Sequence, residues 1–166
     1  MGDKPIHEAA KEGDVEKLKL LLSEGVHVDL FGYEQQTPLM YAALHDKLDA
    51  VKFLIEQKAS VDEDTGIMNG YTALHHACTH GHAEVATWLL DAKADINKQD
   101  GDGWSALMFA AINDRKDCAK LLLKRKADTT IKDRFGQTAL DIAKEHKRDK
   151  IVALLQQHEA DRIAQQ

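Results

Sequence analysis

Apolar and polar residues alternate along the chain in blocks that share one order. Each block opens with a Thr or Ser, continues with a short run rich in Leu and Ala, and breaks at a polar turn. A second run then places Val, Leu or Ile at intervals of three and four residues, the spacing of an amphipathic helix. Segments rich in Gly, Asp and Asn separate the blocks. This pattern predicts two short helices per block and a loop between blocks.

The blocks repeat with a nearly constant period. Four of them begin at Gln36, Tyr71, Trp104 and Gln137, which are 35, 33 and 33 residues apart, and an earlier block fits the same frame. A helix pair of this length cannot bury its own apolar face, but stacked copies bury a continuous core. We therefore expect a single all-α solenoid domain over residues 1–166. Its five repeats are expected at about 4–35, 36–70, 71–103, 104–136 and 137–158, with a C-terminal tail at 159–166.

Hydroxyl residues mark where the first helix of a repeat begins. Thr37, Thr72, Ser105 and Thr138 stand directly before the Leu- and Ala-rich runs. A hydroxyl at this position accepts a hydrogen bond from a backbone N–H that the helix leaves unpaired. Pro38 follows Thr37, at the helical position where a missing N–H costs nothing. We predict that all four side chains cap their helices.

Several short motifs resemble the signature of the ankyrin repeat family. They are TPL at 37–39, TALH at 72–75, GHAEV at 81–85 and ADIN at 94–97, and the resemblance covers nearly the whole chain. It implies antiparallel helix pairs whose connecting loops project as β-hairpin-like fingers. It also implies a non-enzymatic adaptor or scaffold that binds another protein through its concave helix face and fingertips. The alternative is a recognition domain excised from a larger enzyme or channel.

The chain departs from the family pattern where the first helix ends. The family places glycine there, as at Gly13 and Gly81, but Asp46, Asp114 and Lys147 stand at the other three equivalent positions. If these residues keep the left-handed backbone that glycine adopts freely, each costs up to about 1–2 kcal/mol.

Composition narrows the possible functions. Lys and Arg number 22 against 28 Asp and Glu, and a net charge of −6 does not suit binding to nucleic acid phosphates. No stretch approaches 18 consecutive apolar residues, so we expect no membrane insertion. The sequence contains neither a glycine-rich phosphate loop nor a Gly-x-Ser-x-Gly motif. We therefore expect no enzyme activity and no cofactor.

The two cysteines indicate the compartment. Cys78 and Cys118 lie in apolar helical patterns, which predicts buried free thiols in a reducing environment. We expect a monomer in the cytoplasm, with the nucleus as an alternative location. Charge is uneven: residues 124–134 are basic, whereas the first two repeats and the loop at 62–64 are acidic. A basic turn is either a solvated edge or a complement to an acidic partner.

Four of the nine histidines fall within residues 72–82. The resemblance implies structural roles for His75, in the TALH turn, and for His82, in the element that ties neighbouring repeats together. His76 and His80 share a helical face, and His45 occupies the position equivalent to His80. These three histidines could in principle hold a zinc ion. A polar, proton-sensitive contact face is favoured instead, because the spacing places no carboxylate base and no His-Glu-x-x-His motif is present.

Aromatic residues in the inter-repeat loops are the main candidates for partner contact. Tyr71 and Trp104 occupy the same position of consecutive repeats, and a loop that needed only solvation would seldom use them. The alternative is that such rings pack on the next finger, and the two interpretations are balanced for Phe31 and Phe135. Along the first helices, equivalent residues either pack between helices or form the floor of a groove: Tyr41, His76 and Phe109. The predicted contact residues are Tyr33, Met68, Tyr71, His76, His80, Asp102, Trp104, Phe109 and Asn113.

One modification site follows from the resemblance. Leu90 and the ADIN motif that ends at Asn97 look like the ankyrin pattern that an intracellular asparaginyl hydroxylase modifies. Asn97 is therefore a candidate for hydroxylation.

Overall fold

The computed structural model describes residues 3–64 and 70–164, and this part of the chain contains ten α-helices. The helices are α1 Pro5–Glu12, α2 Val15–Ser23, α3 Pro38–Leu44, α4 Leu48–Glu56, α5 Ala73–His80, α6 Ala83–Asp91, α7 Ala106–Ile112, α8 Lys116–Lys124, α9 Ala139–Glu145 and α10 Asp149–Ala164. A single 3-10 turn, η1, covers Tyr33–Gln35 in the first inter-repeat loop.

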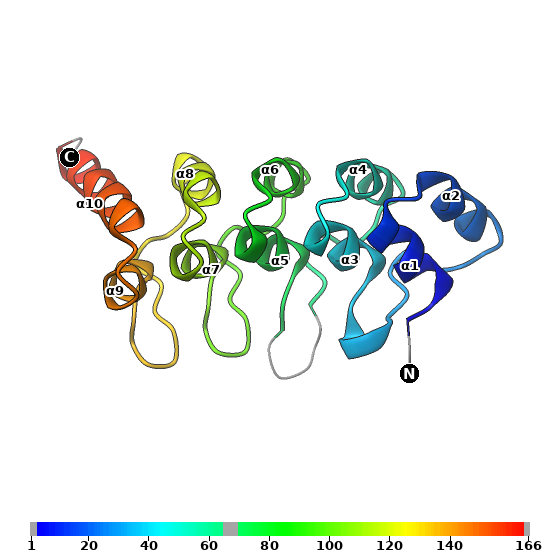
Figure 1. The fold of residues 1–166 in the computed structure, drawn as a ribbon, viewed down its shortest axis with the longest axis horizontal. Coiled ribbons are helices and arrows are strands. Elements are labelled where there is room, and N and C mark those ends of the chain that lie inside the picture. The colour runs from blue at the N-terminus through cyan, green and yellow to red at the C-terminus, as the bar shows by residue number, and fades with distance from the viewer. Residues whose placement is uncertain (1–2, 65–69, 165–166) are drawn as a thin grey trace.

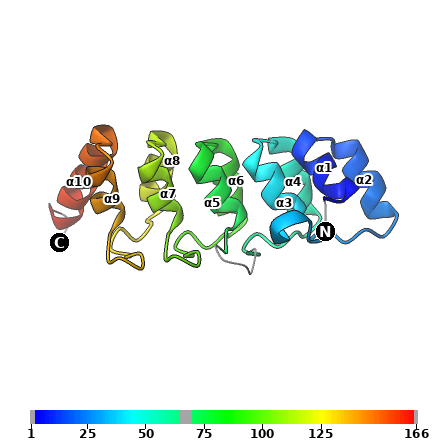
Figure 2. The same ribbon diagram turned by 60° about the horizontal axis from the view of Figure 1, so that its bottom comes forward.

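Five helix pairs stack side by side, with the two termini at opposite ends of the stack (Figure 1). The first helices α1, α3, α5, α7 and α9 form one row, and the second helices form another (Figure 1). The loops between repeats project away from both rows as a line of fingers (Figure 2). The predicted all-α ankyrin-type solenoid is confirmed.

Threonine side chains begin three of the first helices as predicted. The hydroxyl of Thr37, of Thr72 and of Thr138 each accepts a hydrogen bond from the backbone N–H three residues ahead. Ser105 has the same extended backbone, but its hydroxyl makes no cap bond, so the prediction for this residue is wrong. Serine lacks the methyl branch at Cβ, so its hydroxyl direction is less restricted than that of threonine.

Left-handed turns end the first helices at every repeat. The expected positions Asp46, Asp114 and Lys147 have φ values of 56°, 54° and 54°, alongside 79° at Gly13 and 86° at Gly81. The backbone therefore keeps its conformation where the glycine is replaced, as expected. A second left-handed position, which the sequence did not reveal, follows the second helices, at Gly25, Lys58, Lys93 and Lys126.

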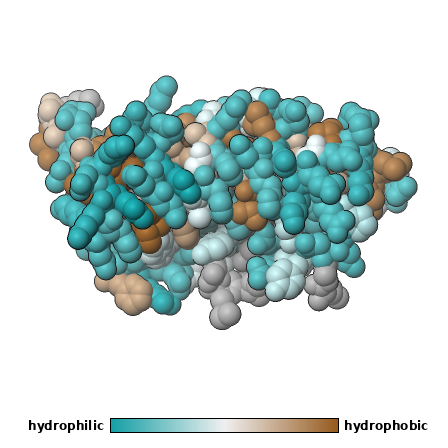
Figure 3. Space-filling view, viewed as in Figure 1, coloured by the Kyte–Doolittle hydropathy of each residue, from teal (hydrophilic) through white to brown (hydrophobic). Residues whose placement is uncertain are grey.

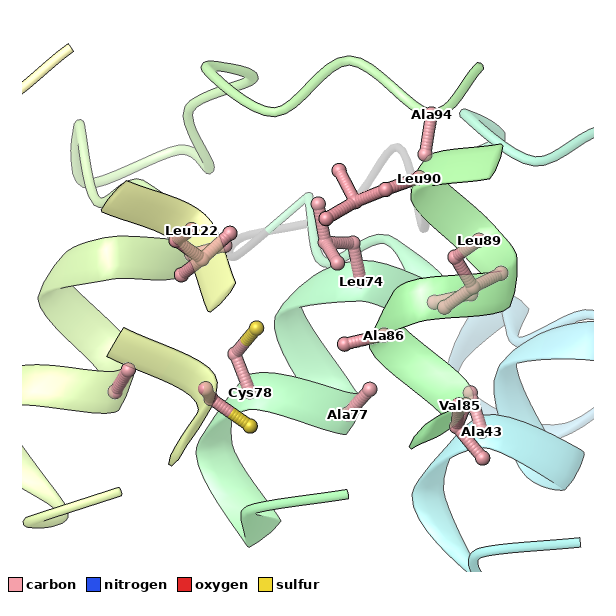
Figure 4. Close-up of a cluster of buried hydrophobic side chains, with 14 of the residues drawn as sticks. Ala43, Leu74, Ala77, Cys78, Val85, Ala86, Leu89, Leu90, Ala94 and Leu122 are labelled. Carbon is pink, nitrogen blue, oxygen red and sulfur yellow. The ribbon is translucent and has the colours of Figure 1, made fainter. Parts of the chain in front are cut away.

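Small side chains allow the first helices to pack closely. Alanines of α1, α3, α5 and α7 are almost completely buried. Figure 4 shows the interior at the third repeat, where Leu74 of α5 lies beside Leu90 of α6 and Cys78 of α5 points toward α8, the helix that carries Leu122. Cys78 and Cys118 are both buried free thiols, as predicted. The core is thus one continuous cluster through all five repeats.

Side chains also join consecutive repeats through backbone carbonyls. The residue that precedes the second helix reaches back to the first helix of the previous repeat. The donors are His82 Nε2 to the Leu44 carbonyl at 3.2 Å, Arg115 Nε to Thr79 at 3.0 Å and Arg148 Nε to Ile112 at 2.8 Å. Each bond satisfies a carbonyl that the helix end leaves unpaired.

His7 and His75 occupy equivalent positions in the first helices of the first and third repeats, and each ties its helix to the finger that follows it. His75 Nδ1 accepts from the Thr72 backbone N–H at 3.0 Å, and Nε2 donates to the Lys98 carbonyl at 3.0 Å. His7 makes the equivalent pair of bonds to Lys4 and Leu30. The final helix, α10, continues to Ala164 and so includes most of the expected C-terminal tail at 159–166.

Candidate partner-binding surface

An aromatic cluster joins the first helices to the bases of the fingers. The Phe109 ring of α7 lies 5.2 Å from the ring of Tyr71 and 5.2 Å from that of Trp104, measured between centroids. His76 of α5 meets the Tyr71 ring edge-on at 5.6 Å. The contact between Tyr71 and Phe109 crosses from the third repeat to the fourth, whereas Trp104 meets Phe109, and Tyr71 meets His76, within one repeat. The cluster therefore joins the finger bases to the first helices of both repeats.

The rings of Tyr71 and Trp104, which the sequence favoured for partner contact, both pack against Phe109. Both are half-buried. Trp104 follows the hairpin tip, where its carbonyl accepts from the Asp100 N–H at 2.9 Å, and its ring turns back onto Phe109. Neither residue is fully buried, so packing and partner contact are compatible at these positions.

The residues equivalent to His76 are mainly packed. Tyr41, His76 and Phe109 are each 8% exposed, so they lie between neighbouring first helices and present only an edge to solvent. Tyr41 donates a hydrogen bond from its hydroxyl to Asp3 Oδ1 at 2.6 Å, and burial together with this carboxylate raises the pKa of Tyr41.

Burial controls the charge state of two histidines. It lowers the pKa of His75 and of His76 to about 4 each, because a charged imidazole loses its hydration there. His76 Nε2 is buried without a hydrogen-bond partner. Both side chains are therefore neutral at physiological pH. The proton-sensitive role expected for His76 would require pH values well below that range.

His80 and Asn113 form the polar part of this face. They occupy equivalent positions of α5 and of the end of α7, and each donates a side-chain hydrogen bond to the carbonyl four residues earlier, at 3.0 Å. His80 is exposed and Asn113 is half-buried. We call Tyr41, His76, His80, Phe109 and Asn113 the first-helix face.

The structure does not assemble a metal site from the histidines. Over residues 3–64 and 70–164, no group of three His, Cys, Asp or Glu side chains is arranged to hold a metal ion. His45 lies within electrostatic range of His80, whose ring stacks on that of His82 at 5.8 Å. Burial and the nearby Lys11, Lys47, His80 and His82 lower the pKa of His45.

Asp102 at the third fingertip is held by a neighbouring finger. Its carboxylate pairs with Arg134 at 2.7 Å, and the Arg134 guanidinium lies 4.8 Å from the centroid of the Phe135 ring. Phe135 itself is 70% exposed. A partner that contacts Asp102 would therefore meet an ion pair with an exposed ring beside it.

The most exposed rings of the fingers lie at the two ends of the stack. Tyr33 is 57% exposed, and its backbone N–H donates to Asp3 Oδ1 at 3.2 Å. Phe31 is 40% exposed and Phe135 is 70% exposed, and these are the two rings for which the sequence left packing and partner contact balanced. Met68, another predicted contact, lies outside the described residues.

The remaining surface is largely polar. On the face seen in Figure 3, hydrophilic surface predominates and hydrophobic surface is confined to separate patches. One exposed ring on the second helices, Trp88, is 41% exposed and lies 5.0 Å from Lys52 Nζ. Among the described residues, no helix combines the length and the apolar character needed to cross a membrane.

Asn97 has a structural role. Its Oδ1 accepts from the backbone N–H of Asp128 in the next repeat at 2.9 Å. Asp29 and Asp62 make the same bond to Ser60 and Asp95. Asn97 is also exposed, so its use in this bond and its accessibility for modification are compatible.

Comparison with known proteins agrees with this architecture. The family model described as "Ankyrin repeats (3 copies)" matches residues 6–100 and 92–166. The chain is 40% identical over 86 residues to a probable E3 ubiquitin-protein ligase, XBOS32, of Oryza sativa, which covers 52% of the chain and 17% of that protein. It is 36% identical over 99 residues to human ankyrin repeat and SOCS box protein 11, covering 60% of the chain and 30% of that protein. A third relative, mouse ankyrin repeat and SAM domain-containing protein 6, is 36% identical over 89 residues, covering 53% of the chain and 10% of that protein. The matched region thus spans less than a third of each relative.

Proposed function

Because the chain belongs to the ankyrin repeat family, whose repeats are non-catalytic protein-interaction modules, we propose that it binds its partner through the first-helix face and the adjoining fingers. The aromatic cluster of Tyr71, Trp104 and Phe109 is the observation that carries this proposal. It joins helix and finger into one rigid surface, and a rigid surface loses little conformational entropy when it binds.

The polar groups beside the cluster suit recognition. The His80 and Asn113 side chains make hydrogen bonds only to their own helices within the described contacts, so both keep polar atoms for a partner. Aromatic area next to such groups is typical of the centre of a binding interface. The surface therefore offers apolar contact together with hydrogen bonding.

The proposal is tested by capture of a partner with immobilised protein, followed by mass spectrometry. His80→Ala combined with Asn113→Ala removes groups from the first-helix face at little cost to the fold, because each side chain bonds only to its own helix. Leu20→Ala combined with Trp88→Ala is the matched control, since both residues are exposed on second helices. We expect capture to fail for the first variant and to persist for the control; the opposite result would show that the binding surface lies on the second helices.

The comparisons support a second proposal, which concerns whether these repeats form part of a larger protein. The three relatives match over at most 30% of their own lengths, and their names include a ubiquitin ligase and a SOCS box protein. We propose that these repeats can serve as the recognition part of a larger protein. An immunoblot of the native source tests this: a single band at the size of the 166-residue chain would contradict it.

A further inference from the structure

We propose that the first finger and the adjacent part of the second form a docking site for a lysine- or arginine-bearing segment of a partner protein, whose cationic side chain lies against the Phe31 ring between Asp29 and Glu63. The inference rests on the proposed binding function and names the chemistry of the partner. It places this contact at the end of the stack remote from Phe135.

A hollow of about 370 Å³ provides the space. It is lined by His27, Asp29, Leu30, Phe31 and Glu63, which come from two consecutive inter-repeat loops. Leu30 is packed against the hydrophobic core, whereas the Phe31 side chain is 40% exposed. The hollow therefore has an apolar base, an accessible aromatic ring and a carboxylate from each of the two loops.

The negative charge around this hollow favours a cationic side chain as its occupant. The segments 26–36 and 59–64 contain five carboxylates and no Lys or Arg. Lys98 of the third finger compensates part of this charge, because its Nζ lies 3.0 Å from Asp64 Oδ2 and donates to the Asp62 carbonyl at 2.8 Å. The last finger is different, since residues 127–137 hold two acidic and two basic side chains. The negative field that would attract a basic segment is thus concentrated at the first two fingers.

The aromatic ring adds a contact that a simple acidic surface lacks. A lysine or arginine over a ring is attracted by its π-electrons, and the chain already shows this with Arg134 over Phe135 at 4.8 Å. Tyr33, which is 57% exposed on the same finger, offers a second ring to the flanking residues of an extended segment. Carboxylates combined with accessible rings fit a cationic side chain better than an acidic or purely apolar one.

Isosteric substitutions can remove the charges without disturbing the fold. Asp29 Oδ1 accepts from the Ser60 N–H at 3.0 Å, and Asn97 makes the equivalent bond to Asp128 at 2.9 Å. Asn is therefore able to support this bond in the same repeat position. The double substitution Asp29→Asn and Glu63→Gln should remove two charges while leaving the finger in place.

The experiment measures binding of two fluorescein-labelled octapeptides, one alternating lysine and serine and the other alternating glutamate and serine, by fluorescence anisotropy at low salt. We expect the lysine peptide to bind at least about tenfold more tightly than the glutamate peptide, and to weaken as salt screens the charges. Asp29→Asn with Glu63→Gln should weaken it about tenfold or more, and Phe31→Leu about two- to fivefold.

Two matched controls separate the site from general charge and exposure. Glu56→Gln with Glu84→Gln removes two exposed charges from α4 and α6, and Phe135→Leu removes the exposed ring of the last finger. Both should change the affinity by less than about twofold. Equal binding of the two peptides by the unaltered protein, or equal effects of the site and control variants, would overturn the inference. A captured partner that is retained at full yield by Asp29→Asn with Glu63→Gln but is lost with His80→Ala and Asn113→Ala would refute this site while leaving the proposed function intact.

Discussion

Replacing Gly81 by alanine should destabilise the protein through the backbone, although alanine is the better helix former. Gly81 has φ of 86°, and a left-handed residue with a Cβ costs about 1–2 kcal/mol. Alanine also restricts the unfolded chain, which offsets about 0.4–1 kcal/mol of that cost. The net loss from the backbone is then about 1 kcal/mol, or a melting temperature lower by about 2–4 °C in a chain of this size.

Crowding adds to the loss at this position. A Cβ on Gly81 would lie 3.0 Å from Arg115 Cδ, and Arg115 Nε donates to the Thr79 carbonyl at 3.0 Å. The arginine must move, which strains a bond between the third and fourth repeats. Gly25→Ala isolates the backbone contribution, because Gly25 has φ of 89° and its Cβ would meet nothing within 4 Å. Gly81→Ala should therefore cost more than Gly25→Ala.

The reverse substitution provides the decisive comparison. Lys147 occupies the position equivalent to Gly81 with φ of 54°, so Lys147→Gly should stabilise the protein by about 0.5–1 kcal/mol. Urea unfolding followed by circular dichroism at 222 nm measures all three variants. If Gly81→Ala proved neutral, or if Lys147→Gly lowered stability, the left-handed backbone could not be the controlling factor.

Three further predictions concern residues that join the repeats. His75 and His76 have pKa values of about 4 in the folded protein, whereas an unfolded histidine titrates near 6.5. Their contribution to the free energy of unfolding is therefore complete above pH 6.5 and is lost as the pH falls towards 4, by roughly 1 kcal/mol each at pH 5.5. Acid unfolding at constant urea should show that His76→Gln reduces this loss of stability. Asn97→Ala should lower the free energy of unfolding by about 1 kcal/mol, because the Asp128 N–H loses its hydrogen-bond partner. Asn97→Asp should leave it nearly unchanged, and equal unfolding midpoints for the two variants would contradict this prediction. Phe109→Ala should cost about 3–5 kcal/mol in urea unfolding and shift the near-ultraviolet dichroism of Trp104, and an unchanged aromatic spectrum would show that the ring cluster does not form.

The sequence predicted the features that depend on short stretches of chain. The 33-residue period and the Thr caps predicted where the helices lie in the chain. Helix capping and amphipathic spacing depend only on residues a few positions apart, so both can be read from the sequence. The left-handed turns at Asp46, Asp114 and Lys147 follow from the position of Gly13 and Gly81 in equivalent repeats. Buried positions of Cys78 and Cys118 follow from the apolar pattern around them.

Only the tertiary structure decided how much of each loop ring is exposed. Tyr71 and Phe109 are 38 residues apart in sequence, yet their rings lie 5.2 Å apart because neighbouring repeats stack. Phe31 and Phe135 stay exposed, although they look no more suited to solvent than Tyr71 does. The exposure of a loop side chain depends on its contacts with the adjacent repeat, and the residue pattern within one repeat does not specify those contacts. The sequence by itself determined the repeat and its helices, and the stacking of repeats decided which side chains remain available to a partner.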